Sequence, residues 1–114
     1  MKYAILIYID EKAPTGTPAE REAIHGEYMA LSEAAGKAGI LVGGEPLEDS
    51  DTATTVRVRD GKRTTTDGPF AETKEVLGGF FLLDVPSIDE ALDFAAKLPA
   101  ARYGSVEVRA IADM

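Results

Sequence analysis

The chain has 114 residues, the length of a single domain spanning 1–114. Its 12 basic and 20 acidic residues give a net charge of −8, which argues against nucleic acid or an anionic membrane as partner. The absence of cysteine excludes disulfides, cysteine-ligated zinc and thiol catalysis. No apolar stretch approaches the roughly 20 residues that span a bilayer. We therefore expect a cytoplasmic protein.

The first part of the chain predicts a strand, a helix and a second strand. Residues 3–9 are apolar on both faces, as in a strand buried on both sides. Thr17-Pro18-Ala19-Glu20 combines an N-cap, a proline at the first helical position and a capping-box glutamate. The helix it begins should end near Gly39, with an apolar stripe of Ile24, Tyr28, Leu31, Ala35 and Ala38. A short strand over 40–42 should close at Gly43-Gly44.

The middle of the chain predicts a loop and a hairpin. An acidic loop over 45–51 contains four carboxylates and no basic residue: Glu45, Glu48, Asp49 and Asp51. Two threonine- and valine-rich runs, 54–59 and 62–66, flank Asp60-Gly61, a strong signal for a hairpin with a type I′ turn. Residues 67–70 read as a second turn.

The last part predicts a strand, a helix and a strand. Residues 78–85 are again apolar on both sides, and 106–110 alternate as in a strand with one wet face. Between them, Ser87 should cap a helix that Pro99 ends. Its inner face is predicted to comprise Ile88, Ala91, Leu92, Ala95 and Leu98.

This order of elements predicts an α+β fold, the ferredoxin-like βαββαβ arrangement with an inserted β-hairpin. Strands 3–9 and 78–85 should be central, since only they are apolar on both faces. Two helices cover one face of such a sheet, so the other face would expose an apolar patch. We expect a homodimer packed sheet face to sheet face. The alternative is that the hairpin and the acidic loop cover that face within one chain.

Candidate chemistry is sparse. His25 is the only histidine and lies at the margin of the apolar helix stripe, where it is either a general base or an ordinary surface residue. Glu45 follows two glycines at a strand exit, where a ligand can approach the backbone. The acidic loop, including Asp51, lacks the calcium-loop spacing and reads more simply as a solvated charge run.

The segment Asp67-Gly68-Pro69-Phe70-Ala71-Glu72 is the densest local signature. Either Asp67 is a turn residue that accepts backbone hydrogen bonds, or it is a cleft carboxylate beside an aromatic wall, Phe70. Residues 56–66 carry a net charge of +3, and Arg57 is a candidate contact for an anion there, although a solubilising hairpin face is the simpler explanation of the charge. Phosphate loops, hydrolase elbows and zinc-binding histidine motifs are missing. We expect no metal and no cofactor.

Residues 66–75 resemble the DGPF-domain branch of the YCII-related family, and the start, Gly78-Gly79-Phe80-Phe81 and residues 104–109 fit the same family. The resemblance implies a dimeric α+β barrel of ferredoxin-like protomers. It also implies a family of mostly unknown activity, with members associated with extracytoplasmic-function sigma factors, suspected histidine–aspartate chemistry and one branch with a dehydrochlorinase. In this chain the family histidine falls nearer Glu27 than His25.

Two functions are compatible with these observations. One is a small-molecule-binding or acid–base enzyme-like protein, in which a cleft between the sheet and the first helix holds Asp67 and either His25 or Glu27. Phe70 and Pro69 would line it, with Glu45, Asp51 and Arg57 as further contacts. The other is a non-catalytic dimeric regulatory module, in which residues 67–70 are a structural turn. The residues alone leave open whether the protein is an enzyme.

Overall fold

The computed structural model describes residues 1–14 and 16–113. One four-stranded antiparallel sheet has the strand order β2 (Leu41–Pro46), β5 (Val76–Asp84), β1 (Lys2–Ile9) and β6 (Ser105–Ala110). The two strands with two-sided apolar patterns, β1 and β5, are central. This order confirms the ferredoxin-like arrangement predicted from the sequence.

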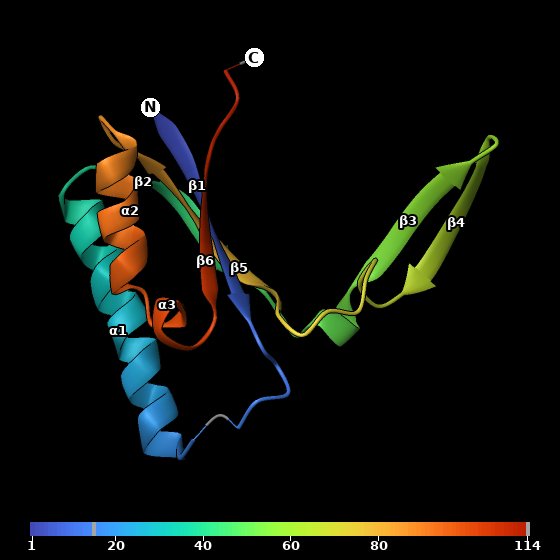
Figure 1. Ribbon diagram of the computed structural model, residues 1–114, viewed down its shortest axis with the longest axis horizontal. Helices are drawn as coiled ribbons and strands as arrows, with labels where there is room; N and C mark the ends of the chain where they lie inside the picture. Colours follow the sequence, from blue (N-terminus) through green and yellow to red (C-terminus); the bar gives the residue numbers. More distant parts are fainter. Residues whose placement is uncertain (15, 114) are drawn as a thin grey trace.

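Three helices pack on one side of this sheet: α1 (Pro18–Lys37), α2 (Ile88–Lys97) and the short α3 (Ala100–Tyr103) (Figure 1). The start of α1 is built as its sequence predicts. Thr17 Oγ1 accepts a hydrogen bond from the Glu20 backbone N–H at 3.1 Å and donates one to the Glu20 carboxylate at 3.2 Å. Because the first of these bonds satisfies a free N–H of the first turn, the helix begins at Pro18.

The core lies between the sheet and the helices. Ile5 and Leu83 of the central strands are fully buried, as are Val85 and Leu98. The ring of Phe81 meets that of Phe94 edge to face, with ring centroids 5.3 Å apart. Along β1, the helix side is therefore Tyr3, Ile5 and Ile7, and the alternate side chains point to the other face.

The predicted inner face of α2 is partly wrong. Ala91, Ala95 and Leu98 are buried as expected, but Ile88 and Leu92 are 47% and 46% exposed, and Phe94 is buried in their place. The positions 91, 94, 95 and 98 also follow helical spacing, so the helix is rotated such that Phe94, the aromatic residue of α2, faces the core. The short helix α3, which begins directly after Pro99, is not predicted from the sequence.

Strand β2 is longer than predicted. It runs through Gly43 and Gly44 to Pro46, because these residues pair with β5 up to Gly79. The acidic loop is correspondingly shorter, and Ser50–Thr52 form a single 3₁₀ turn, η1. Glu11 fixes this turn by accepting hydrogen bonds from the backbone N–H and the hydroxyl of Ser50, at 2.7 and 2.6 Å.

The predicted hairpin is confirmed as β3 (Thr54–Arg59) and β4 (Lys62–Asp67), a separate two-stranded sheet. Asp60 and Gly61 at its tip have φ angles of 53° and 74°, as a type I′ turn requires. The hairpin projects from the side of the main sheet opposite the helices and stands away from the body (Figure 1). It therefore does not lie flat on the open sheet face of its own chain.

Candidate functional site

The open face of the main sheet is apolar at its centre. It carries the β1 and β5 residues that alternate with the core positions: Ala4, Leu6, Tyr8, Phe80 and Leu82. In register, Leu6 lies opposite Phe80, and Ala4 lies opposite Leu82. These side chains are half-buried in one chain, and all three described helices lie on the other side of the sheet (Figure 1). The structure thus presents the apolar patch on which the predicted dimer depends.

Carboxylates flank this patch on both edge strands. Glu45 of β2 lies opposite Phe80, and Glu107 of β6 lies opposite Leu6, so one row across the sheet has acidic ends. Glu107 forms an ion pair with Arg109, two residues further along the same strand. Glu45 has no ion-pair partner among the described residues. Of the two, Glu45 is therefore the carboxylate free to meet a ligand or a partner.

Residues 67–70, the DGPF segment, lie at the base of the hairpin. Hydrogen bonds to their backbone hold them there. The Gly68 N–H donates to the Ala53 carbonyl at 2.6 Å, and the Thr55 hydroxyl donates to the Gly68 carbonyl at 2.8 Å. Arg57 Nη2 donates to the Phe70 carbonyl at 3.4 Å. The segment is thus fixed without using its own side chains.

Two side chains of this segment remain open to solvent. Asp67, opposite Thr54 at the end of β4, is exposed, and its carboxylate accepts no hydrogen bond from any residue between 1 and 113 that the structure describes. Phe70 is 78% exposed, while Pro69 between them is half-buried. The alternative in which Asp67 caps the turn is therefore not what the geometry shows.

The candidates on the first helix have a different environment. Glu27 accepts two hydrogen bonds from the Arg102 guanidinium, at 3.2 and 2.9 Å, which ties α1 to α3. This bidentate contact raises the pKa of Arg102 above its usual value. His25 is exposed on α1. Since α1 covers one face of the sheet and the hairpin projects from the other, one chain does not bring His25 or Glu27 to Asp67 (Figure 1).

The remaining candidates lie in η1 and in the hairpin. Asp51 is exposed in η1, next to the Ser50 that Glu11 holds. Arg57 reaches the DGPF segment through its contact with the Phe70 carbonyl. One contact is not predicted from the sequence. The Ser105 hydroxyl donates a hydrogen bond to the Glu75 carboxylate at 2.7 Å, although the two residues are 30 positions apart. No local pattern in the sequence predicts such a pairing.

Tyr28 lies in the predicted apolar stripe of α1 and also makes a polar contact that the stripe does not predict. Its hydroxyl accepts a hydrogen bond from the Ala100 N–H at 3.2 Å and so joins α1 to α3. Burial, reinforced by the neighbouring Tyr103, raises the pKa of Tyr28 from 10.0 to about 12. The folded protein therefore favours the neutral phenol.

This raised pKa predicts a loss of stability in alkaline solution. The contribution of Tyr28 is complete below pH 10 and is lost as the pH rises through about 12, because the unfolded chain releases this proton first. Urea unfolding at several pH values should show a decline over that range that is smaller in Tyr28→Phe. At neutral pH the free energy of unfolding of Tyr28→Phe should be about 1 kcal/mol lower than that of the wild type, since the Ala100 N–H loses its hydrogen-bond acceptor. Equal declines in both proteins would contradict this role.

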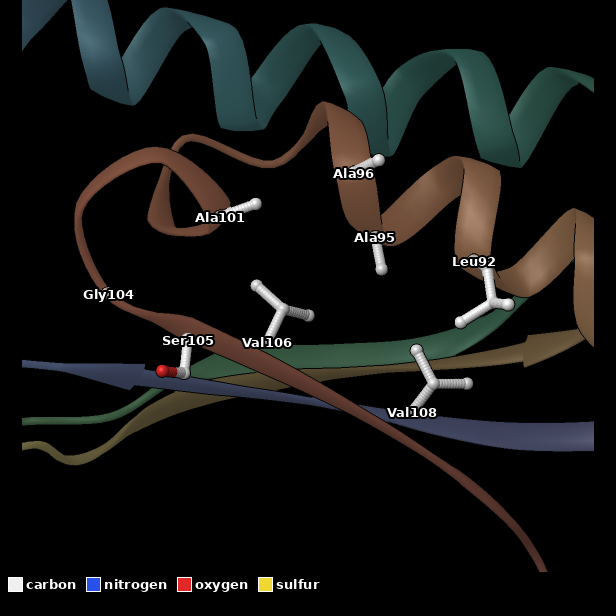
Figure 2. Close-up of a pocket in the computed structure, with 8 residues that line it drawn as sticks. All are labelled: Leu92, Ala95, Ala96, Ala101, Gly104, Ser105, Val106 and Val108. Atoms are coloured by element: carbon white, nitrogen blue, oxygen red, sulfur yellow. The ribbon is translucent and has the colours of Figure 1, made fainter.

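Two shallow depressions lie elsewhere on the surface. One, of about 290 Å³, is bounded by α2, α3 and β6, and Figure 2 shows Leu92 and Ala95 pointing toward Val106 and Val108 across it. None of its lining residues is acidic, basic or histidine. The other, of about 310 Å³, lies between α1 and α2. Neither is lined by a residue of the DGPF segment.

Other kinds of site are not seen in the described ranges 1–14 and 16–113. No three His, Asp or Glu side chains there come together as a metal site would require. No helix in the same ranges combines the length and the apolar character needed to cross a membrane.

Comparison with known proteins identifies the family. The family profile described as YCII-related domain matches residues 1–114. The chain belongs to the YCII-related family. An uncharacterized protein of Rhizobium meliloti is 42% identical over 115 residues, covering 98% of this chain and 93% of that protein.

A solved structure shares the fold of this YCII-related protein. It is 5-chloro-2-hydroxyhydroquinone dehydrochlorinase (TftG) from Burkholderia phenoliruptrix AC1100 in complex with 2,5-dihydroxybenzoquinone. The TM-score is 0.54 with 16% sequence identity, over 98% of this chain and 94% of that one. At this identity the likeness shows the fold alone and leaves the activity of the present chain to its own residues.

Proposed function

We propose that this protein is a homodimer that binds a small molecule at the DGPF segment, with Asp67 as its proton-transfer group. Phe70 supplies an apolar wall. Arg57 of β3 is a cation whose guanidinium contacts the Phe70 carbonyl. Glu27 takes no part, because its carboxylate is bound to Arg102 on the opposite side of the sheet. His25 lies on that same helix and is likewise left out of the site.

The observation that carries this proposal is the contrast between backbone and side chains at residues 67–70. Three hydrogen bonds fix the backbone around Gly68 and Phe70, so the turn does not need the Asp67 carboxylate. A carboxylate and an aromatic ring are nonetheless held on a fixed backbone, exposed and without partners among the described residues. An acid–base group beside a flat apolar surface suits a small ring compound with ionisable hydroxyl groups.

The fold relative supplies a suitable probe. TftG is named as a dehydrochlorinase and was solved with 2,5-dihydroxybenzoquinone, which is a small ring carrying hydroxyl groups. The likeness in fold supports only the choice of this compound as a first ligand, since the sequences are 16% identical.

Binding of 2,5-dihydroxybenzoquinone, measured by isothermal titration calorimetry, tests the proposal. Asp67→Asn and Phe70→Ala should each weaken binding by about tenfold or more, which corresponds to about 1.4 kcal/mol. The matched control is Asp60→Asn at the hairpin tip, where Asn-Gly preserves the type I′ turn. This control should bind as the wild type does. An Asp67→Asn variant that binds with unchanged affinity would overturn the assignment.

The second candidate is a dimeric module without catalysis. It is favoured by the positions of the two depressions, since neither is lined by residues of the DGPF segment. In that case the wild type should form the dimer yet bind none of the probe, and Asp67→Asn should leave both properties unchanged.

A further inference from the structure

The β3–β4 hairpin makes the chain far less compact than its length requires. The radius of gyration is 16.0 Å, whereas a compact chain of this length has a value of about 13 Å. Nearly every hairpin residue is exposed, and Figure 1 shows it standing clear of the main sheet. An isolated two-stranded hairpin is marginally stable in water, so this one is expected to gain stability from another surface.

The two faces of the hairpin differ in chemistry. Val56 and Val58 alternate with Arg57 and Arg59 along β3, so the valines share one face and the arginines share the other. Both valines are prominent, at 57% and 60% exposed. Lys62 of β4 lies opposite Arg59 and adds a third cation to the arginine face. Three of the four hairpin cations thus lie on the arginine face, while the valine face carries the two valines and one cation, Arg63, opposite Val58.

The charge of the hairpin is opposite to that of the remaining chain. Residues 56–66 contain four basic residues and one acidic residue, a net charge of +3, while the other residues contain eight basic and nineteen acidic ones, a net charge of −11. Within the described ranges, none of the four hairpin cations forms an ion pair with a carboxylate. The surface that complements this hairpin best is therefore a second copy of the same chain.

The position of the hairpin favours the same occupant. It projects from the side of the sheet that carries the open apolar face (Figure 1). A copy seated on that face lies beside the hairpin. The acidic residues of that copy at the end of β2 and in the loop that follows are Glu45, Glu48, Asp49 and Asp51, and none of them is ion-paired among the described residues.

We propose that the β3–β4 hairpin is an arm that packs against a second copy of this chain, its basic face directed at that copy's acidic loop. The inference rests on the dimer of the proposed function and adds a consequence for its site. Asp67 and Phe70 lie at the base of the arm, so the ligand site is bordered by both copies and is incomplete in one chain. By two-fold symmetry, the dimer has two arms and two such sites.

Charge reversal on the arm tests this proposal. The double variant Arg57→Glu/Arg59→Glu should raise the dimer dissociation constant at least tenfold at about 50 mM salt, measured by analytical ultracentrifugation. The difference from wild type should shrink at about 500 mM salt, because screening weakens exposed charge pairs. The matched control, Lys37→Glu/Lys97→Glu, changes the same charge on two helices and should leave dimerisation as it is.

Cross-linking gives a second readout that does not depend on affinity. Since the chain has no cysteine, Thr64→Cys and Glu48→Cys each place a single thiol, and Thr64 lies opposite Arg57 on the arginine face of the arm. Two differently tagged preparations, one with each variant, are mixed and treated with a bismaleimide. A mixed cross-linked pair is expected, whereas Thr64→Cys mixed with Lys37→Cys should give none.

The outcomes separate the arm from the dimer. If the wild type is dimeric and the arginine reversal leaves its dissociation constant unchanged, the arm is overturned and the dimer stands. If the wild type sediments as a single chain, the dimer of the proposed function fails, and the arm fails with it. A mixed cross-link that forms only for the hairpin and acidic-loop pair supports the arm.

Discussion

Sedimentation equilibrium at micromolar concentration is expected to give twice the 12.1 kDa chain mass for the wild type and a single-chain mass for Leu6→Glu. Leu6 lies at the centre of the open face, between Phe80 on one neighbouring strand and Glu107 on the other. In a face-to-face dimer, Leu6→Glu would bury two unpaired carboxylates close to Glu107. Burial of an unpaired charge costs several kcal/mol, enough to weaken the dimer by about a thousandfold.

The control for this substitution is Leu92→Glu. Leu92 allows the same substitution on the helix side of the molecule, since it is a leucine of α2 that is 46% exposed. Leu92→Glu should keep the dimeric mass. Far-UV circular dichroism of both variants separates dissociation from unfolding, because the Leu6 side chain is already half-exposed in one chain. A dimer that survives Leu6→Glu but not Leu92→Glu would place the interface on the helices instead.

The sequence predicted the topology because burial and pattern agree in the central strands. Residues of β1 and β5 are apolar on both faces, so they had to lie in the middle of the sheet, and the sheet order confirms it. The hairpin was predicted equally well, since Asp60-Gly61 accepts the positive φ angles of its turn. Local signals sufficed wherever backbone conformation was set by neighbouring residues.

The candidate site was less predictable, because its contacts join distant segments. Glu27 and Arg102 are 75 residues apart, and no local pattern predicts that the carboxylate offered as a base is held by a guanidinium. The DGPF segment was located correctly at the end of β4. That its aspartate lacks a described partner follows from how Ala53, Thr55 and Arg57 satisfy the backbone around it, which is a matter of tertiary packing.

The direction in which the hairpin extends was also beyond the sequence. Its turn and register are local, but its angle to the main sheet depends on the connecting segments around η1 and residues 68–75. Folding back over the open face was one alternative, and the structure shows the hairpin projecting away instead (Figure 1). The apolar face therefore remains available to a second copy.

Gly104→Ala is expected to be the most destabilising of the single substitutions proposed for the folded chain. Gly104 ends α3, where its N–H donates to the Ala100 carbonyl at 2.7 Å, and it leads directly into β6. A Cβ at this position would overlap the Tyr8 carbonyl oxygen of β1 and lie 3.3 Å from the Ala100 carbonyl oxygen. Both are backbone atoms, so the overlap can be relieved only by moving β6 away from β1.

A shift of this kind resembles overpacking of a core, which costs about 3 kcal/mol at its upper range. The matched control is Gly36→Ala in α1, where a Cβ meets nothing within 4 Å. Because alanine favours a helix over glycine by about 1 kcal/mol, this control should stabilise the protein. In chemical denaturation, Gly104→Ala should therefore lower the free energy of unfolding and Gly36→Ala should raise it, although both replace glycine by alanine.

Both variants must be compared at one protein concentration, because the proposed dimer would contribute to the measured free energy of unfolding. Ser105, the residue after Gly104, pairs with Tyr8, whose side chain lies on the open face. A backbone shift at Gly104 thus reaches the proposed interface, and Gly104→Ala should also weaken the dimer. If Gly104→Ala unfolds at the same denaturant concentration as the wild type, the close approach of β6 to β1 does not limit stability.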